Sequence, residues 1–385
     1  MRFMRALRGL LALTVATAAS GATIFQPPPF SSLFETSIRS AAMGGAGAAV
    51  IWGEPAAWSN PATLSHVNGL GWATGHTEGP IYTSRRPEDV EFSSQRLFIG
   101  GGGVGFTLMG EPISGLGKAR FDHAAIALPL GQSGPRPYDQ TEGWGVGVSP
   151  LRLVESVRKL GKMHPHSFTS FGDVTVGYQD KSSKASNGTS TFDLAGTYDW
   201  GVAGKLAVSR LWGEDTPFRM DLSGSYSQIN VLKSESNGTG VSTNQFDRIG
   251  AALHLSPAPP FARSSSPPSL PWWRPGDVPE LSIGLAYDHD RRHGEPFGGS
   301  ESSVDHYGFE ANVFRLISLR VGYLSDPEAD TEGMTYGGGV ALPVGPWGSV
   351  GYQLANVPNA SGLDRLFRQG WTVWLDPSRI WGYAR

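Results

Sequence analysis

The chain of 385 residues contains no cysteine, few charged residues and, beyond its N-terminus, no long apolar run. Without cysteine, a disulfide scaffold, a Cys-ligated zinc site, a thiol nucleophile and an N-terminal lipid anchor on cysteine are excluded. The formal net charge is only −3, so a basic surface for nucleic acid is not expected. A transmembrane helix needs about 18 or more apolar residues, so a membrane span in the body of this chain could only be a closed β-barrel.

The residues that are abundant are glycine and the aromatics. The chain has 52 Gly, 12 Trp, 11 Tyr and 18 Phe, whereas charged residues make up 17%. This aromatic content is too high for a disordered chain, and the charged fraction lies below the roughly 25% of an ordinary soluble domain. The composition therefore indicates a folded protein with an unusually uncharged surface.

The first residues have the form of an export signal. Three arginines precede the short apolar stretch Leu10–Ala19, and small residues then offer cleavage sites between Ala18 and Thr23. The apolar stretch is about half of the ~20 residues that a membrane anchor helix requires. We therefore expect residues 1–22 to be a signal peptide, and a mature chain outside the cytoplasm.

The body of the chain alternates with a period of two residues, as strands do. Within the segment 218–226, one face carries Phe218, Met220, Leu222, Gly224 and Tyr226, and the other carries Arg219, Asp221, Ser223 and Ser225. The pattern recurs in candidate strands near 68–76, 94–109, 120–130, 142–149, 167–179, 190–200, 202–212, 217–230, 246–256, 280–290, 303–314, 316–324, 334–343, 347–356 and 367–375. The segment 94–109 could be one long strand or two short ones. Only 151–160 has a helical pattern, and we expect this helix to lie in a loop.

Two architectures fit such strands. A soluble β-sandwich or propeller would bury the apolar face, whereas a membrane barrel would turn it toward lipid. Small and polar residues on the opposite face, and aromatics at strand ends such as Tyr178, Trp200, Tyr226, Tyr287 and Tyr323, favour the barrel. Bacterial barrels have even strand numbers, and we predict 14. The Pro-rich segment 257–279 is then a long loop, since proline cannot donate to a strand ladder.

A segment before the first strand resembles the opening of the FadL/PorV-like outer-membrane barrel families. Residues 37–64 read SIRSAAMGGAGAAVIWGEPAAWSNPATL. An arginine precedes a Met-Gly-Gly-Ala run, and a Trp-x-Asn-Pro-Ala motif follows. The matching residues are Arg39, Met43, Gly44, Gly45, Ala46, Trp58, Asn60, Pro61 and Ala62. A second, supporting match is similar to the penultimate hairpins of the PorV-like branch and runs through Gly308-Phe309-Glu310 and Leu319–Tyr323.

This resemblance implies an all-β fold, a transmembrane antiparallel β-barrel of about 14 strands with an N-terminal luminal plug. Residues 23–66 would form the plug and 67–376 the barrel. The function implied is passage of hydrophobic or small solutes across the outer membrane, with membrane lipid and a hydrophobic small molecule as partners. The alternative, from the PorV-like branch, is a scaffold or shuttle for secretion and surface attachment of a protein cargo. The tail 377–385 departs from the families, because a terminal phenylalanine is expected there.

Motifs for catalysis and cofactors largely fail, so no enzyme, cofactor or metal is predicted. Gly100, Gly102 and Gly105 satisfy G-x-G-x-x-G, but a strand rather than a helix follows. His164-Pro165-His166 and Asp288-His289-Asp290 with His293 could ligate a metal only in principle. On the polar faces of the strands, the candidate lumen-lining residues are Asp193, Asp199, Arg219, Asp221 and Asp288. They would either set the polarity of a channel or line a filled interior.

Overall fold

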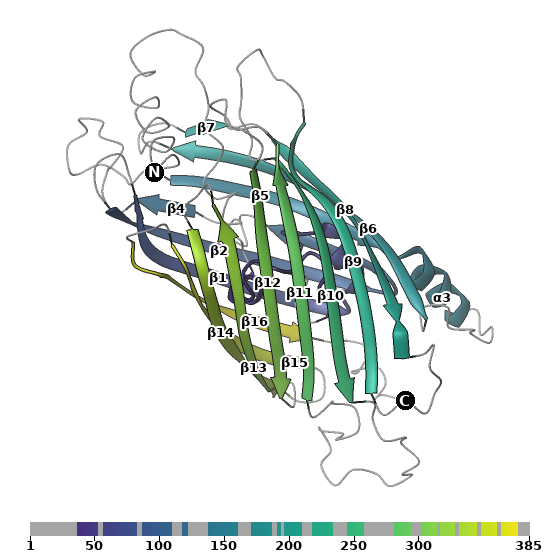
Figure 1. Ribbon diagram of the computed structural model, residues 1–385. Coiled ribbons are helices and arrows are strands. Elements are labelled where there is room, and N and C mark those ends of the chain that lie inside the picture. The colour runs from purple at the N-terminus through teal and green to yellow at the C-terminus, as the bar shows by residue number, and fades with distance from the viewer. Residues whose placement is uncertain are drawn as a thin grey trace.

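The computed structural model describes residues 37–52, 57–82, 87–109, 118–121, 138–160, 171–186, 191–193, 196–209, 218–233, 245–257, 281–293, 302–313, 316–327, 331–344, 348–359 and 363–375. In this part of the chain, sixteen strands form one antiparallel sheet, which closes because β1 pairs with β16 (Figure 1). The strands are β1 (Gly69–Tyr82), β2 (Pro87–Gly101), β3 (Val104–Met109), β4 (Lys118–Phe121), β5 (Tyr138–Val148), β6 (Gly172–Ser186), β7 (Thr191–Asp193), β8 (Thr197–Ala207), β9 (Phe218–Leu232), β10 (Phe246–Pro257), β11 (Leu281–Arg292), β12 (Ser302–Val313), β13 (Ile317–Asp326), β14 (Thr331–Val344), β15 (Gly348–Val357) and β16 (Leu366–Leu375). The helices are α2 (Ile38–Ala42), η3 (Pro61–His66) and α3 (Pro150–Leu160).

Two positions in the wall are each filled by two strands in succession. Both β3 and β4 lie between β2 and β5, and β7 and β8 follow one another along β6. The described wall therefore has 14 antiparallel positions, which confirms the predicted number. The predicted signal peptide, nearly all of the Pro-rich segment 257–279 and the tail 377–385 lie outside the described residues.

Two of the predicted strand boundaries are settled by the ladders. The segment 94–109 is two strands, β2 and β3, joined at Gly102 and Gly103, whose φ angles are +65° and +92°. Positive φ at both central residues is the geometry of the tight hairpin turn that glycine favours. The prediction of separate strands at 190–200 and 202–212 is wrong, because β8 runs unbroken through Gly201.

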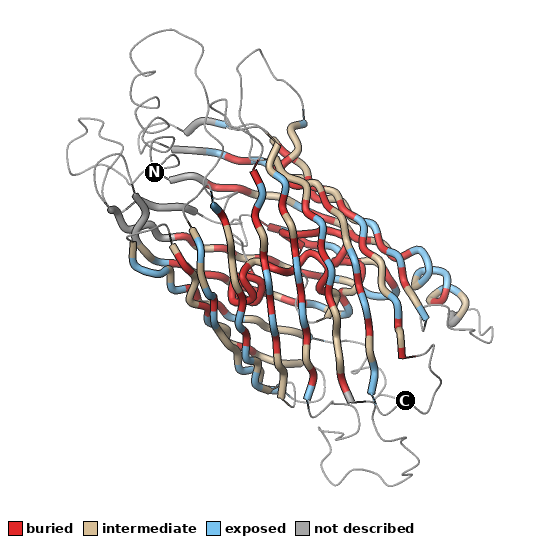
Figure 2. Tube along the Cα trace, viewed as in Figure 1, coloured by how far each residue is buried: buried red, intermediate tan, exposed pale blue. Residues whose placement is uncertain are grey.

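In the barrel wall, apolar side chains face outward and polar side chains face inward, which is the inverse of a soluble protein. Along β11, the outward Leu281, Leu285 and Tyr287 are 43%, 46% and 37% exposed, whereas the inward Asp288 and Asp290 are 0% and 5% exposed. Figure 2 shows the same alternation of exposed and buried residues on the neighbouring strands. Apolar side chains are exposed on the outer face all the way around the barrel. Such a surface requires an apolar solvent, so the barrel spans a membrane. This excludes the soluble sandwich and propeller.

Aromatic residues form rows on the outer face. Tyr287, Tyr307 and Tyr323 face one another across β11, β12 and β13, with ring centroids 5.1 Å and 6.4 Å apart. Trp200 and Tyr226 form a similar contact at 5.5 Å. Such rows are typical of the aromatic belts that mark membrane interfaces.

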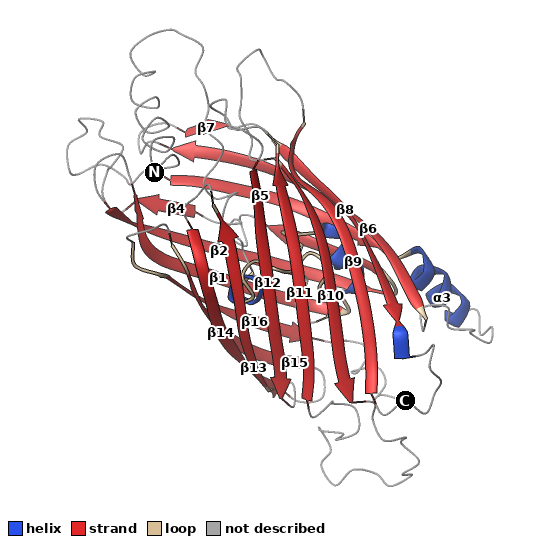
Figure 3. Ribbon diagram, viewed as in Figure 1, coloured by secondary structure: helices blue, strands red, loops and turns tan. Residues whose placement is uncertain are grey.

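The helices are short. The segment predicted to be helical, 151–160, is α3, which connects β5 to β6. No helix among the described residues is long and apolar enough to cross a bilayer. The other two helices lie inside the barrel (Figure 3).

Candidate functional site

The interior of the barrel is occupied by the segment that precedes β1. We call residues 37–52 and 57–67 the plug. Helix α2 packs against β13–β16, and η3 packs against strands from β2 to β8, on the far side of the lumen. Nearly every plug residue is buried, although only a single layer of sheet separates the plug from the outer surface of the barrel. The plug is therefore surrounded by the wall.

After helix α2, the Met-Gly-Gly run lies directly against the backbone of the barrel wall. Ser37 caps the helix by accepting a hydrogen bond from Ser40 N, 3.3 Å away. The chain then turns at Gly44, where φ is +72°, a left-handed conformation that disfavours any residue with a Cβ. A Cβ built on Gly44 would lie 2.6 Å from Tyr323 O, and one built on Gly322 would lie 2.2 Å from Gly44 N. Glycines on both surfaces thus permit direct backbone contact between plug and wall.

A buried cluster of charges fastens the start of the plug. Arg39 donates from Nε to Glu310 Oε1 at 2.9 Å and from Nη2 to Oε2 at 2.5 Å. Arg320 also donates to Glu310 Oε1, at 2.8 Å, and Trp52 Nε1 donates to Oε2, at 3.1 Å. The side chains of Arg39, Glu310 and Arg320 are 6%, 1% and 5% exposed. Buried charges of this kind persist only when they are paired and hydrogen-bonded, so the cluster fixes the position of Arg39.

A second cluster holds the glycine-rich run. Asp288 Oδ2 accepts hydrogen bonds from Gly47 N at 2.7 Å and Ala48 N at 2.8 Å. On the neighbouring strand, His306 Nδ1 lies 2.7 Å from Gly44 O. The other ring nitrogen of His306 lies 3.1 Å from Asp290, which in turn forms an ion pair with Arg248. The wall therefore supplies both acceptors and donors to the plug backbone.

Wall hydroxyl groups satisfy further plug carbonyls. Ser223 donates to Ala49 O at 2.7 Å, Ser227 to Ser59 O at 2.8 Å, and Thr335 to Ala42 O at 2.8 Å. Because the plug forms little regular secondary structure, its buried backbone groups need such side-chain partners.

The Trp-x-Asn-Pro-Ala motif forms the second anchor. Asn60 caps η3, since its Oδ1 accepts from Ala62 N at 2.9 Å, and Pro61 occupies the first position of the helix, where no donor is needed. The Asn60 amide also donates to Ala48 O and to Val202 O, each at 3.2 Å. One side chain thus links the two halves of the plug and joins them to β8.

Trp58 lies against a buried ion pair of the wall. Lys181 Nζ is 2.7 Å from Asp199 Oδ1, and both side chains are 0% exposed. The ammonium group also lies 4.5 Å from the centroid of the Trp58 ring, within the range of a cation–π contact. Asp199 accepts a further hydrogen bond from Asn230 N at 2.8 Å.

Three large apolar side chains face inward from β2 and β3, on the same inward faces as the polar Ser94, Arg96 and Thr107. Phe92 and Phe98 are fully buried on the inward face of β2, and Met109 is 4% exposed on β3. Plug residues Trp58 and Leu64 pack in the same region, against Met109 and Phe98 respectively. We call Phe92, Phe98 and Met109 the apolar strip, although Arg96 lies between the two phenylalanines on the inward face of β2.

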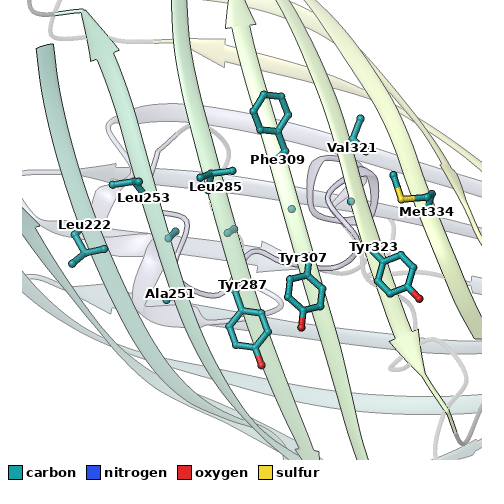
Figure 4. A pocket seen from close by; sticks show the side chains of 14 residues that line it. Leu222, Ala251, Leu253, Leu285, Tyr287, Tyr307, Phe309, Val321, Tyr323 and Met334 are labelled. Carbon is teal, nitrogen blue, oxygen red and sulfur yellow. The ribbon is translucent and has the colours of Figure 1, made fainter.

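Behind the Met43–Gly44 contact, the outer wall carries a shallow groove of about 490 Å³. Figure 4 shows the outward side chains that line it, with the hydroxyls of Tyr287, Tyr307 and Tyr323 all directed toward one end. Gly308 and Gly322 lie at its floor, and their inner sides touch the plug. At this point, therefore, only the backbone of the strands separates the plug from lipid.

Some solved structures of transport proteins are similar to this chain. No family model and no curated protein matches it. The toluene transporter TbuX of Ralstonia pickettii is 14% identical, with 89% of this chain and 98% of that chain covered and a TM-score of 0.39. A FadL homologue of Pseudomonas aeruginosa is 10% identical, with the same coverage and a TM-score of 0.43. The toluene transporter TodX of Pseudomonas putida is 11% identical, with 91% and 98% covered and a TM-score of 0.38.

The predicted plug residues lie together inside the lumen. Arg39, Met43, Trp58, Asn60 and Ala62 are all buried there, Gly44 makes the contact described above, and a Cβ built on Gly45 would lie 2.6 Å from His306 Nδ1. Of the candidate lumen-lining residues, Asp199, Asp221 and Asp288 are buried and face inward. Asp193 is exposed on β7, and the side chain of Arg219 is 57% exposed, beside Asp221.

The sequence prediction missed the wall residues that hold the plug. Glu310, Arg320, Asp290, Arg248 and His306 were not predicted to face the lumen, although each is a charged or titratable residue at an inward position of its strand. Strand parity could have identified them. Among the described residues, no group of three or more His, Asp or Glu could hold a metal ion, and His164 and His166 lie outside those residues.

Proposed function

We propose that this chain is an outer-membrane barrel that passes small hydrophobic solutes past its luminal plug. The observation that carries the proposal is the apolar strip of Phe92, Phe98 and Met109, in which Phe98 clusters with plug residue Leu64 and Met109 with plug residue Trp58. Polar residues line most of the remaining inner wall, so an apolar solute has a preferred side of the lumen.

The attachment of the plug supports the same proposal. The plug is joined to the wall by hydrogen bonds, ion pairs and glycine contacts rather than by a large apolar core. A plug held in this way blocks free diffusion of ions and sugars, and it can shift when a few polar contacts are exchanged. The alternative of a secretion scaffold has no observation in its favour within the described ranges, and it stays a prediction.

Uptake by whole cells tests the proposal. A Gram-negative host that lacks its own barrels for hydrophobic solutes would produce the chain, and initial uptake of radiolabelled oleate, toluene and a disaccharide would be measured. We expect higher uptake of the apolar solutes than in the empty-vector host, and no change for the sugar. Equal gains for all three would indicate an open pore, and no gain for any would overturn the proposal.

A matched pair of variants tests the apolar strip. Met109→Ser changes a luminal methionine, whereas Met334→Ser makes the same change on the outer wall, where Met334 is 53% exposed. We expect Met109→Ser to lower uptake of the apolar solutes several-fold and Met334→Ser to leave it unchanged, at equal amounts of folded barrel. A gel comparison of unboiled and boiled samples measures the folded amount.

A further inference from the structure

Helix α3 has its apolar side directed away from the protein. Leu151, Leu153, Val154 and Val157 are 39%, 41%, 48% and 59% exposed. Residues three and four positions apart share one face of a helix, so these four side chains form a continuous apolar surface. A helix that covers a soluble protein would turn such a surface inward.

The polar side of the same helix is used to attach it to the barrel. Arg152 Nε lies 2.6 Å from Asp173 Oδ2 at the start of β6, and Ser156 Oγ donates to Gly102 O in the β2–β3 turn at 3.2 Å. Glu155, which lies between Arg152 and Ser156 in the sequence and on the polar side of the helix, is 5% exposed. The N-terminus is fixed by Ser149, whose Oγ accepts from Arg152 N at 3.1 Å and donates to Asp173 Oδ1 at 2.5 Å. Polar contacts with the start of β6 and with the β2–β3 turn therefore set the orientation of α3.

The apolar surface of α3 continues the lipid-facing surface of the wall. Phe171, directly before β6, is 53% exposed, and Val174, the first large outward residue of β6, is 56% exposed. Val174 lies two residues into the strand, about 7 Å from its start. Figure 1 shows α3 beside that end of β6, at the edge of the barrel. The helix thus lies at the margin of the apolar band rather than over the mouth of the lumen.

The charges of the helix fit the same environment. Its sequence PLRLVESVRKL contains three basic residues and one acidic residue, and one of the basic residues, Arg152, is paired with Asp173 of the barrel. A helix with an apolar face and an excess of basic residues binds the boundary between headgroups and acyl chains, especially in membranes with anionic lipid.

We propose that α3 is an interfacial helix that rests on the bilayer around the barrel, with Leu151, Leu153, Val154 and Val157 inserted among the phospholipids. The helix would fix the depth and tilt of the barrel on the side of β5 and β6. This role does not depend on the solute that the barrel passes.

Site-directed fluorescence tests the proposal, because the chain has no native cysteine to remove. Val157→Cys would carry an environment-sensitive dye, and the protein would be reconstituted in vesicles of phosphatidylethanolamine and phosphatidylglycerol. Val176→Cys, on the outer band of β6, is the lipid-exposed control. Ser303→Cys, exposed on β12 beyond the tyrosine row, is the water-exposed control. Quenching by nitroxide on the lipid acyl chains and by aqueous iodide would be measured at each site.

The expected result is lipid quenching at position 157 comparable to that at 176, and an iodide quenching constant at least about twofold lower than at 303. Adding Leu153→Asp to the labelled protein should shift the dye toward water, because a charged residue weakens insertion. Strong iodide quenching without lipid quenching would place the helix in water and overturn the proposal. Protection from both quenchers would show that another protein surface, such as a second copy, covers it, and would also overturn the proposal.

Discussion

Arg39 and Glu310 are separated by 271 positions in the sequence, yet they form a two-point ion pair inside the barrel, with Arg39 Nη2 2.5 Å from Glu310 Oε2. Glu310 also binds Arg320 of the adjacent strand β13, so one carboxylate is paired with two guanidinium groups. The carboxylate is therefore the central member of the contact between α2 and the wall.

Replacing Glu310 by alanine should destabilise the barrel and release the start of the plug. Removing one partner of a buried ion pair costs about 3–5 kcal/mol, because the remaining charge loses its compensation. The free energy of unfolding in urea and the ion conductance in planar bilayers would be measured. We expect a lower unfolding free energy and a raised conductance for Glu310→Ala. The matched control is Glu332→Ala, an exposed carboxylate on β14, which should change neither quantity appreciably.

Substitutions of Asn60 can separate its two roles. Asn60→Asp keeps an oxygen that can cap η3 but cannot donate to Ala48 O and Val202 O, and it directs a buried negative charge toward both carbonyls. Asn60→Ala loses the cap and the donors, at a cost of about 2 kcal/mol. We therefore expect the unfolding free energy to fall further in the aspartate variant than in the alanine variant. If capping were the only role, the aspartate variant would instead match the wild type.

Gly322 tests the close contact of plug and wall. A Cβ at this position would lie 2.2 Å from Gly44 N and from the Met43 carbonyl carbon, so Gly322→Ala must displace backbone. We expect a loss of stability of about 1–3 kcal/mol, as for an overpacked core, and faster protease cleavage within the plug. Gly224→Ala is the matched control, because the nearest atom to its Cβ would be 3.8 Å away. Equal effects of the two substitutions would contradict the contact.

The wall could be predicted from sequence because its signal is local. In β11, apolar residues such as Leu285 alternate with polar residues such as Asp288, and successive side chains of a strand point to opposite faces. The alternation therefore gave both the strands and their lipid-facing side. Near strand ends the alternation says less about burial: Asp193 and Arg219, both assigned to the lumen, are exposed, although Arg219 is paired with the inward Asp221.

The contacts of the plug could not be predicted in the same way. No local period relates Arg39 to Glu310, because their distance depends on how a whole barrel closes around a separate segment. Gly201 shows the same limitation within a strand. It was interpreted as a break between two strands, but it is small because Asn60 Oδ1 lies 2.2 Å from where its Cβ would be. A glycine required by the plug was thus indistinguishable, in sequence, from a glycine at a turn.

The Lys181–Asp199 pair allows a double-mutant cycle on the opposite side of the lumen. Both side chains are 0% exposed, and Lys181 also donates to Asn230 Oδ1 at 2.5 Å. Lys181→Met and Asp199→Asn should each cost about 3–5 kcal/mol of unfolding free energy, since each leaves one buried charge without its counterion. The double variant leaves neither charge, so it should cost less than the sum of the two by up to about 3 kcal/mol. Urea unfolding of the four proteins in the same vesicles measures this difference. Strictly additive losses would mean that the two charges do not stabilise one another, and that Lys181 is held by its other contacts, with Asn230 and the Trp58 ring.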